Sequence, residues 1–478
     1  MSERDGVYVV GCDRLHRALP RLARAADVLV LNSVCDADLF PLIAERGARN
    51  AATVFEVSDD FSAVQPWNPI YGFYQNPANV RLYKQLARAC DAMQHTVPEL
   101  ARLYGHLGRS SRVFVNHLLE MPPPPRRSDG ERLRIGWGGS SGHREDIARI
   151  APALCQWISH TPGATLALMC SDSIWELFAS LPNTRKARTA TGSIDDYYRF
   201  VASLDIGLAP LGDTAFNRSR SDVKFVEYAA FGAAAIVQDF EPYRSTAKDG
   251  ENARVVRDSD GLVAALDALA KSPGERARLR DAAYSYVSTE RTQRAHAAER
   301  LDFYASLAAG DCPGAVDIAA LFGEIESWEG AEVTGRHALL AHTRIERGMH
   351  DALVLAQQDG KRAEARSLLA DVARRAPALD LPHLYAGGLF ADATELTKAL
   401  KLNPKSVTAL VGLGRIALAA GAAAEALGYF VRAIELAPAH DELYRQASVA
   451  AAALGAKPDA ASLLEHAETL ARQLEPAA

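Results

Sequence analysis

Three cations and a carboxylate lie close together in the segment 216–232, which reads FNRSRSDVKFVEYAAFG. Arg218, Arg220 and Lys224 stand at the start of a stretch with helical spacing, where unpaired backbone N–H groups already favour an anion. Glu227 follows Lys224 by about one helical turn, so both side chains lie on roughly the same face. The cations suit a diphosphate and the carboxylate suits two sugar hydroxyls, which is the layout of a nucleotide-sugar site. The alternative is a solvated basic turn followed by a surface Lys–Glu pair.

The same segment predicts one short helix that positions these side chains. Ser221 is expected as its N-cap, because a hydroxyl can accept a hydrogen bond from the first turn. Gly232 follows the last periodic residue and suits the left-handed conformation at a helix end. Between them, Val223, Val226 and Ala230 recur at the spacing of a stripe that faces a core.

A second candidate is the glycine-rich turn 138–142, GGSSG, which follows an expected buried strand. Gly138 and Gly139, with Ser140, would let backbone N–H groups come close to a phosphate. Arg144 opens the next helix and can add a positive charge. The spacing matches neither the dinucleotide-binding motif nor the P-loop, so the glycines can equally serve close packing alone.

Asp59 and Asp60 close an expected strand, 53–57. Paired acids can act as a general base, hold a metal ion or bind acceptor hydroxyls. No further carboxylate or histidine stands at ligand spacing nearby, so we expect contact with acceptor hydroxyls and no metal. The aromatic loop 65–77, QPWNPIYGFYQNP, can stack on a sugar or form a packed lid.

The histidines carry less information. His95 and His117 belong to no motif, and a lone histidine is more often structural than catalytic. His143 is either a surface imidazole or a further cation at the start of a helix. The sequence contains neither a nucleophile elbow nor an HExxH motif.

Composition places the chain among soluble globular proteins. Its 478 residues exceed what one core usually holds, so two or three domains are expected. A net charge of −6 and a pI of about 6.1 argue against general binding to nucleic acid. The six cysteines are scattered without a CxxC pair, as in reduced cytosolic proteins. The sequence shows no apolar run of membrane-spanning length and no signal-peptide pattern, so we expect a cytoplasmic protein.

Residues 1–125 predict a parallel α/β domain. The expected strands are Val7–Val10, Val28–Leu31, Thr53–Val57, Ala92–Thr96 and Arg112–Val115. The expected helices are Leu15–Ala25, Leu39–Arg46, Val80–Cys90 and Pro98–Leu107. Short strands separated by helices indicate parallel βαβ units. The proline run 122–125 and the charged patch after it mark the domain boundary.

Residues 130–310 predict a second domain of the same kind. The expected strands are Leu133–Trp137, Ala164–Met169, Asp205–Leu211, Ala233–Gln238 and Arg254–Val256. Helices are expected at about 144–158, 173–181 and 194–204 and over most of 262–307. Ligands bind at the carboxyl ends of the strands in such sheets. The turn 138–142 and the segment 216–221 both follow strands, so we expect them to meet at one site.

The C-terminal part, 313–478, has a different character, because the strand signal vanishes and a helical repeat begins. Gly421 and Gly455, like Pro404 and Pro438, recur after 34 residues, and a shortened copy lies upstream. This period, with small residues at the helix crossings, is the tetratricopeptide pattern. We expect a helical solenoid with a groove that suits an extended peptide.

The stretches LRIGWGGSSGHRED and DIGLAPLGDTAFNRSRSDVKFVEYAAFGAAAIVQDFEPYRS resemble the C-terminal domain of retaining GT-B glycosyltransferases, the group 1 or family 4 set. The resemblance covers 133–260 well and 50–120 more loosely, through VFEVSDDF and CDAMQHTVPELARLYG. It implies an α/β fold of two Rossmann-like domains in the GT-B arrangement, here followed by the all-α tetratricopeptide-like helical repeats. It also implies retaining, hexosyltransferase-type transfer from a nucleotide diphosphate-sugar bound in the cleft between the two domains.

The resemblance implies roles for individual residues. Lys224 and Arg218 would stabilise the leaving diphosphate, and Glu227 matches the glutamate that binds the ribose. Asp59 or Asp60 would face the acceptor. The implied donor-binding set is Gly138, Gly139, Ser140, Arg144, Asn217, Ser219, Lys224 and Glu227. Retaining members of this fold generally need no metal, because cationic side chains and helix dipoles stabilise the diphosphate.

Two positions depart from the family pattern. Ser219 stands where the family's E-x7-E motif has its first glutamate, which contacts the transferred sugar. Ser58 and Asp59 stand where many members carry His-Asp. Donor recognition and the chemistry on the acceptor side are therefore the points at which this chain is expected to differ.

The sequence thus predicts a glycosyltransferase whose acceptor is a protein or peptide recruited by the helical repeats. Three alternatives stay open. The acceptor can instead be a polysaccharide or lipid-linked glycan, with the repeats used for assembly. The chain can be a non-catalytic scaffold with a decayed nucleotide site, or an epimerase that uses no acceptor. We expect no nucleic-acid partner and no transmembrane segment in the chain.

Overall fold

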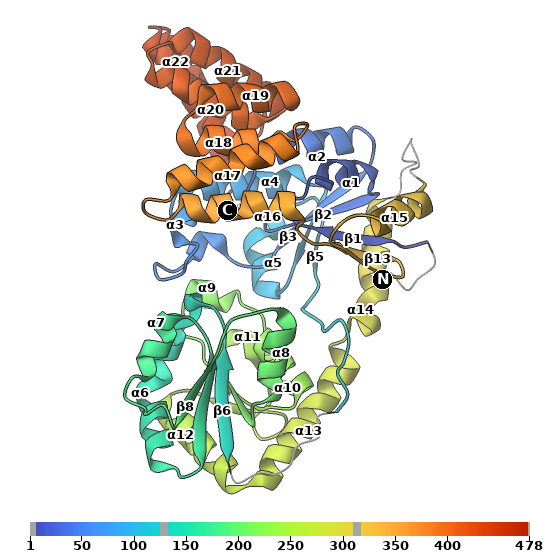
Figure 1. Ribbon diagram of the computed structural model, residues 1–478. Helices are drawn as coiled ribbons and strands as arrows, with labels where there is room; N and C mark the ends of the chain where they lie inside the picture. The colour runs from blue at the N-terminus through green and yellow to red at the C-terminus, as the bar shows by residue number, and fades with distance from the viewer. Residues whose placement is uncertain (1–5, 125–131, 309–316, 477–478) are drawn as a thin grey trace.

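The structure is a computed structural model that describes residues 6–124, 132–308 and 317–476. Figure 1 shows two α/β parts, one above the other, and a layered array of helices beyond the upper part. The predicted domain boundaries, at 125–130 and 310–313, lie outside the described residues.

The first sheet has four parallel strands in the order β2-β3-β4-β5. They are β2 (Val28–Asn32), β3 (Ala52–Val57), β4 (Ala92–His95) and β5 (Ser111–Val113). The helices that connect them are α2 (Leu39–Gly47), α3 (Tyr71–Tyr74), α4 (Pro77–Ala89) and α5 (Pro98–Tyr104), with 3-10 turns at Phe61–Ala63 and Gly105–Leu107. These elements confirm the parallel βαβ prediction for this part of the chain.

The first strand, β1 (Val9–Cys12), belongs to a different sheet. It pairs in parallel with β13 (His337–Leu340), which also pairs antiparallel with β12 (Ala331–Thr334). Helices α1 (Leu19–Ala25) and α15 (Ile318–Glu326) cover this small sheet. The expectations that this strand opens the first sheet and that no strand follows residue 313 are therefore wrong. The partners are more than 300 residues apart, and local periodicity cannot reveal such pairing.

The second sheet has six parallel strands in the order β11-β10-β9-β6-β7-β8. They are β6 (Leu133–Gly138), β7 (Ala164–Met169), β8 (Lys186–Thr189), β9 (Ile206–Ala209), β10 (Ala234–Gln238) and β11 (Arg254–Val256). Counted from β6, this is the doubly wound order 3-2-1-4-5-6, with the reversal between β6 and β9. Strand β8 was not predicted, because its sequence, KART, carries no apolar pattern.

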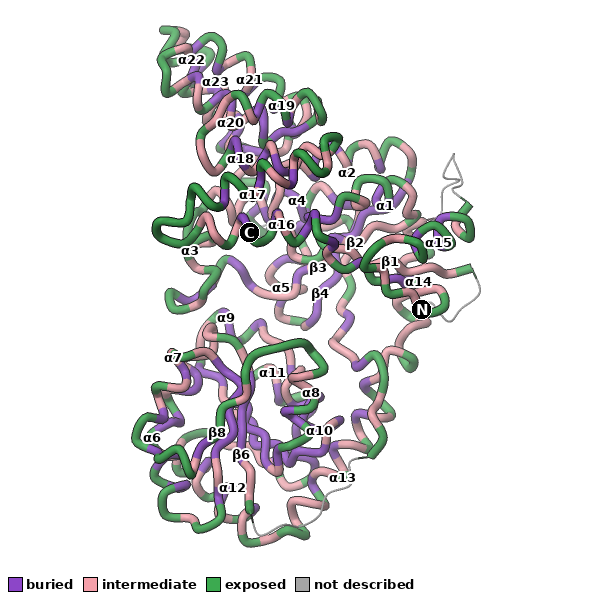
Figure 2. The backbone as a smooth tube through the Cα atoms, viewed as in Figure 1, coloured by how far each residue is buried: buried purple, intermediate pink, exposed green. Residues whose placement is uncertain are grey.

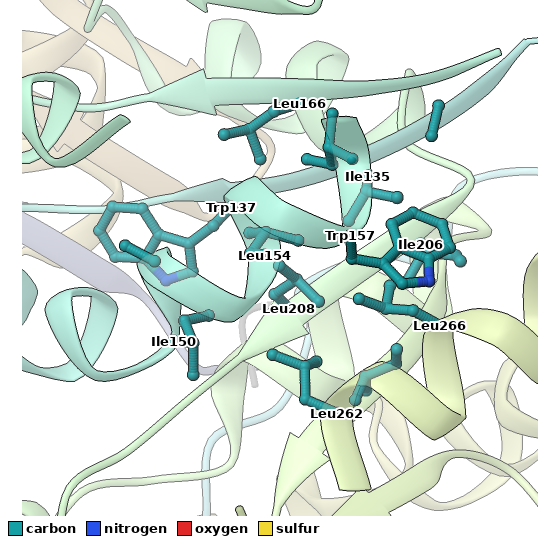
Figure 3. Close-up of a cluster of buried hydrophobic side chains, with 14 of the residues drawn as sticks. Ile135, Trp137, Ile150, Leu154, Trp157, Leu166, Ile206, Leu208, Leu262 and Leu266 are labelled. Carbon is teal, nitrogen blue, oxygen red and sulfur yellow. The ribbon is translucent and has the colours of Figure 1, made fainter. Parts of the chain in front are cut away.

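Helices cover both faces of this sheet. On one face lie α6 (Arg144–His160) and α12 (Ser259–Lys271), whose apolar side chains share a core with the strands. Figure 3 shows that core, in which Trp157 and Leu266 meet Ile206. On the other face lie α8 (Ile194–Ala202), α10 (Val223–Phe231) and α13 (Pro273–Glu290). Short helices α7 (Asp172–Trp175), α9 (Ala215–Arg218) and α11 (Glu241–Arg244), with a 3-10 turn at Glu176–Phe178, complete this part. In Figure 2 the strands between these layers are mostly buried.

Helix α14 (Gln293–Leu307) leaves the second sheet and returns to the first, as Figure 1 shows. Its Phe303 packs with Val54 and Phe114 of the first sheet region. The Tyr304 hydroxyl donates a hydrogen bond of 2.7 Å to the side chain of Gln94. The chain therefore crosses between the two α/β parts a second time before the helical array begins.

The array contains α16 (Arg344–Ala356), α17 (Arg362–Arg375), α18 (Leu381–Phe390), α19 (Ala393–Leu402), α20 (Val407–Ala419), α21 (Ala423–Leu436), α22 (Asp441–Ala453) and α23 (Lys457–Arg472). Gly360, Gly421 and Gly455 follow α16, α20 and α22, and each has a positive φ, between 75° and 80°. Glycine adopts this left-handed conformation without steric cost, which explains its recurrence at these turns. The assignment to the tetratricopeptide family stays a prediction.

One edge of the array is buried against the first domain. Leu410, Leu443 and Leu474 share a core with Phe40 and Tyr83 of the first domain. This burial removes part of the array's surface from contact with any other molecule.

Polar contacts fix the same junction. Arg81 of α4 lies 2.6 Å from Asp441, whose side chain is fully buried, and Gln85 donates to the other oxygen of that carboxylate at 3.0 Å. Asp38 accepts hydrogen bonds from the Ser406 hydroxyl and the Thr408 amide. The array is thus held to the first domain at a defined position.

Candidate active site

The candidate site lies at the carboxyl ends of β6 and β9, where the strand order of the second sheet reverses. Doubly wound sheets bind ligands in the crevice at this point. Gly138 ends β6, and the segment after Ala209 of β9 leads through α9 into α10. The expected meeting of the glycine turn and the basic segment is therefore observed.

Lys224, Tyr197 and Glu227 form the centre of this site. The Lys224 ammonium donates hydrogen bonds to the carbonyl oxygen of Gly138 and, at 2.9 Å, to the Tyr197 hydroxyl. That hydroxyl donates to Glu227 Oε2 at 2.7 Å. The ammonium also lies 4.7 Å from the centre of the Tyr197 ring. Lys224 and Glu227 thus share one partner, Tyr197, which sequence reasoning missed because the contact between the predicted helix 194–204 and α10 depends on tertiary packing.

Burial sets the electrostatics of this trio. Desolvation lowers the pKa of Lys224, although Glu227 acts in the opposite direction. Desolvation likewise raises the pKa of Glu227, opposed by Lys224 and by the hydrogen bond from Tyr197. Both charged forms are costly in this environment. A ligand that brings an anion to Lys224 and hydroxyl groups to Glu227 would supply the partners that water cannot.

The glycine turn serves close packing. A Cβ atom on Gly138 would lie 3.0 Å from the rings of Tyr197 and Phe200, and one on Gly139 would lie 2.5 Å from the ring of Trp137. The Gly139 amide already donates to the carbonyl oxygen of Met169 at 3.0 Å. The glycines thus let the aromatic side chains approach the end of β6. Ser140, at the exposed end of this turn, uses its carbonyl oxygen to accept from the His143 amide.

A polar chain crosses from the second domain to the first. The Arg220 guanidinium lies 2.9 Å from Asp59 Oδ1, and its other terminal nitrogen lies 2.7 Å from His143 Nε2. His143 Nδ1 lies 2.9 Å from Asp146 Oδ2. These partners assign the hydrogen to Nδ1, so that Nε2 accepts from Arg220. Burial lowers the pKa of His143. Because its Nε2 accepts from Arg220 and its Nδ1 faces Asp146, the ring connects these two residues as a neutral imidazole.

Asn217 is buried and serves the fold of the α9 segment. Its amide nitrogen donates to Asp146 Oδ1 at 2.8 Å and to the carbonyl oxygen of Gly212 at 2.9 Å. Its side-chain oxygen accepts from Gln65 of the first domain at 3.3 Å. Gln65 also donates to Thr214 at 2.9 Å. Asn217 therefore connects the loop 65–77 to the second domain, and both polar atoms of its side chain have hydrogen-bond partners.

Three other expected site residues point elsewhere. Arg218 is exposed and pairs with Asp213, so it does not join Lys224. Arg144 pairs with its neighbour Glu145 at 2.6 Å. Asp60 is buried and accepts hydrogen bonds of 2.5 Å from the hydroxyls of Tyr104 and Ser62. Asp59 alone of the two acids faces the second domain. Sequence spacing predicted the strand ends and helix starts at which these residues lie, but it could not predict where their side chains point.

Two features of the α10 region differ from expectation. Ser221 is not the N-cap; that position is Asp222, and the Ser221 hydroxyl accepts a hydrogen bond from Asn116. Asp222 is held by both terminal nitrogens of Arg291. Ser219 is fully buried, and its hydroxyl oxygen has no hydrogen-bond partner among the described residues. Gly232 does end the helix with a positive φ of 78°, as predicted.

In the described ranges, no three His, Cys, Asp or Glu side chains are grouped as metal ligands. No helix in the same ranges is both long and apolar enough to cross a membrane.

Comparisons with known proteins bear on this site. Residues 145–303 match a protein family described as glycosyl transferase-like. That segment begins at α6 and ends in α14, so it includes the α9–α10 region and its basic side chains. No curated protein matches the chain.

Solved structures resemble it at low identity. Sucrose-phosphate synthase from Thermosynechococcus elongatus is 14% identical, covers 62% of this chain and 79% of that one, and has a TM-score of 0.45. HepE from Anabaena, solved with UDP, is 12% identical. The match covers 60% of this chain and 81% of HepE, with a TM-score of 0.45. TarM, from S. aureus, is 8% identical, covers 60% and 56%, and scores 0.48. Residues 145–303, which form most of the second of the two parallel α/β domains, therefore match a glycosyl transferase-like family.

Proposed function

We propose that the chain transfers a sugar from a nucleoside diphosphate-sugar to an acceptor, with retention of the anomeric configuration. The observation that carries the proposal is the hydrogen-bonded, partly buried Lys224–Tyr197–Glu227 trio at the reversal point of a doubly wound sheet. A cation and a carboxylate of this kind, side by side in a crevice, suit a diphosphate attached to a ribose.

Each polar group then has a role. Lys224 meets the diphosphate, since its ammonium lies beside the end of β6, and Arg220 can add a second positive charge from the adjacent segment. Glu227 accepts hydrogen bonds from the ribose hydroxyls in exchange for the one from Tyr197. Charge builds up on the leaving diphosphate as the glycosidic bond breaks, and fixed cations in a site shielded from water stabilise it without a metal.

Asp59 is the acid that stands on the acceptor side of the cleft. Its carboxylate reaches Arg220 across the domain boundary, whereas Asp60 is occupied by Tyr104 and Ser62. Once a donor diphosphate competes for Arg220, the Asp59 carboxylate is free to contact an acceptor hydroxyl. The acceptor is a protein or a glycan, and the helical array is the candidate for recruiting a protein partner.

A second candidate function is a non-catalytic scaffold. Ser219 favours it, because a serine whose hydroxyl has no hydrogen-bond partner in the described part of the chain stands where the resembling family has a glutamate that contacts the transferred sugar. A scaffold would retain the fold of the crevice and lose the binding of the nucleotide.

A thermal-shift panel of UDP, GDP, ADP, CDP and TDP, and of their sugars, separates the two candidates. A ligand that binds only the folded protein raises its stability by mass action. A shift with one nucleoside diphosphate, lost in Glu227→Ala and kept in Glu241→Ala, supports the transferase. Glu241 is a suitable control because it is exposed on α11. The matching sugar donor is then tested for transfer, and NMR of the product reads the anomeric configuration. A wild-type protein that responds to no nucleotide favours the scaffold.

A further inference from the structure

A cavity of about 460 Å³ lies outside the crevice, between the first domain and the C-terminal end of the helical array. Sites for small ligands occupy roughly 300–1,000 Å³. One wall comes from the segment 61–84 and the other from the residues at and after the end of α23. The cavity is therefore formed only where these two parts of the chain meet.

The floor of this cavity is apolar and rigid. Phe61, Val64 and Leu474 line it, and each is at least nine-tenths buried. The ring of Tyr74 stacks on Phe61 at 4.4 Å between centres, with the planes 4° apart. On the opposite wall, the carbonyl oxygen of Leu474 lies 3.0 Å from His106 Nε2, which ties the end of α23 to the first domain. The cavity is therefore preformed.

The rim carries polar groups whose bonding capacity is unused. Within the described ranges, no hydrogen bond or ion pair joins the Tyr71 hydroxyl, the Tyr74 hydroxyl, the Lys84 ammonium or the Glu475 carboxylate to another residue. Lys84 and Glu475 line the same cavity, yet the two charges do not form an ion pair. Their positions suit a ligand that both donates and accepts hydrogen bonds between them.

Aromatic faces, an apolar floor and a rim of mixed donors and acceptors match a carbohydrate. A sugar ring presents C–H groups on its faces and hydroxyls around its edge, and each hydroxyl both donates and accepts. A peptide that bound by a charge alone would favour a rim of one sign, whereas this cavity is lined by two cations, Arg81 and Lys84, and one anion, Glu475, and Arg81 is already paired with Asp441.

One segment of chain runs from the cavity to the boundary with the second domain. Gln65, next to the cavity residue Val64, donates hydrogen bonds to Thr214 and Asn217 across the domain boundary. Beyond it, the Asn68 side chain lies close to Gly142 of the glycine turn. A chain of sugars that follows this segment would reach from the cleft to the cavity.

We propose that this cavity is an acceptor subsite for an oligosaccharide, whose growing end lies in the cleft while an inner sugar occupies the cavity. The inference rests on the proposed glycosyl transfer and names its acceptor as a glycan. It also gives the end of the helical array a direct part in substrate binding, as one wall of the subsite.

Saturation-transfer NMR on the full-length protein tests this without a donor. The probe is a mixture of glucose, N-acetylglucosamine, glucuronic acid and their homodisaccharides. We expect saturation transfer to at least one sugar with the wild type. In Tyr71→Ala the dissociation constant of that sugar should be at least tenfold higher. Lys84→Met should weaken the binding of the same sugar and keep the fold intact, because the Lys84 side chain makes no polar contact with any residue that the structure describes. Ile70→Ala is the matched control, since it lies on the same segment and does not line the cavity.

The outcomes separate the two proposals. If nucleoside diphosphates stabilise the wild type and no sugar is saturated, the subsite is wrong and the transferase stands. If a sugar binds and is lost in Tyr71→Ala while no nucleotide binds, the subsite is a carbohydrate site and the transferase fails. The subsite is wrong if a sugar binds equally well to Tyr71→Ala, Lys84→Met and Ile70→Ala. It is also wrong if hexaglutamate peptide competes for the cavity and a sugar does not.

Discussion

Arg220 and Asp59 join the two α/β domains across the cleft, with 2.9 Å between the guanidinium and the carboxylate. Arg220 precedes helix α10, whereas Asp59 follows strand β3 of the first sheet. The same guanidinium also contacts His143 of the second domain, so this one side chain links the segment before α10 to the end of β3 and to the turn that holds His143. A donor diphosphate at Lys224 would compete with Asp59 for this cation.

Arg220→Ala should weaken the binding of the nucleoside diphosphate by about 1.5–3 kcal/mol, or roughly 10- to 150-fold in Kd, the usual effect of losing a charged hydrogen-bond donor. Arg218→Ala should change it by less than about threefold, because that side chain pairs with Asp213 at the surface. Isothermal titration measures both. If Arg218→Ala had the larger effect, the direction of these two side chains would be wrongly assigned.

Glu227→Ala should weaken nucleotide binding by about 1–3 kcal/mol, because the ribose hydroxyls lose a charged acceptor. Tyr197→Phe should have a smaller effect on the same titration, since the ribose is expected to replace its hydroxyl at Glu227. Wild-type affinity in Glu227→Ala would remove the ribose from this position.

His95 should make the fold sensitive to acid. Both ring nitrogens are buried without hydrogen-bond partners among the described residues, and burial lowers the pKa of His95 to about 4. Between that value and the unfolded value of about 6.5, the unfolded chain binds the extra proton, so stability falls as the pH is lowered through this window. From pH 7 to pH 5 this residue alone should remove about 2 kcal/mol from the free energy of unfolding.

His95→Leu should therefore reduce the loss in melting temperature between pH 7 and pH 5, as differential scanning calorimetry reads it. His160→Gln, at an exposed position, is the control and should leave the pH dependence unchanged. A pH dependence that is identical in His95→Leu and in the wild type would mean that His95 finds a partner in solution.

Asp441→Ala should loosen the helical array from the first domain. The variant leaves Arg81 and Gln85 without their shared carboxylate, and removal of one partner from a buried ion pair costs about 3 kcal/mol or more. Hydrogen exchange should rise over 403–443, at the edge that faces the first domain. Glu465→Ala changes an exposed carboxylate of α23 and should leave that exchange as in the wild type.

A chain that ends at residue 312 should aggregate or expose apolar surface to a hydrophobic dye. It lacks β13, the partner of β1, and it lacks Leu410, Leu443 and Leu474, which cover the first domain. Size-exclusion chromatography and dye fluorescence check this. A monomeric, compact product that still binds the nucleotide would show that the array is independent of the domain it covers.

Local pattern determined much of this protein from sequence alone. The buried strand Ala164–Met169 and the half-buried edge strand Arg254–Val256 were predicted with the bounds that the structure shows, because short apolar runs between turn residues are local signals. The meeting of the glycine turn and the basic segment followed from the rule that ligands bind at the carboxyl ends of parallel strands. Lys224 and Glu227, one helical turn apart, lie together as expected.

Only the tertiary structure decided which side chains face the site. Arg218 and Arg220 are two residues apart and of the same type. Arg218 nevertheless forms an ion pair at the surface, whereas Arg220 bridges the two domains. Strand β1 finds its partner more than 300 residues away, and Tyr197 enters the site from a helix whose preceding strand has no apolar pattern. Sequence spacing fixes which residues share a helix face or a strand end. The direction of a loop side chain and the partner of an edge strand depend on contacts between distant segments, and these exist only once the chain has folded.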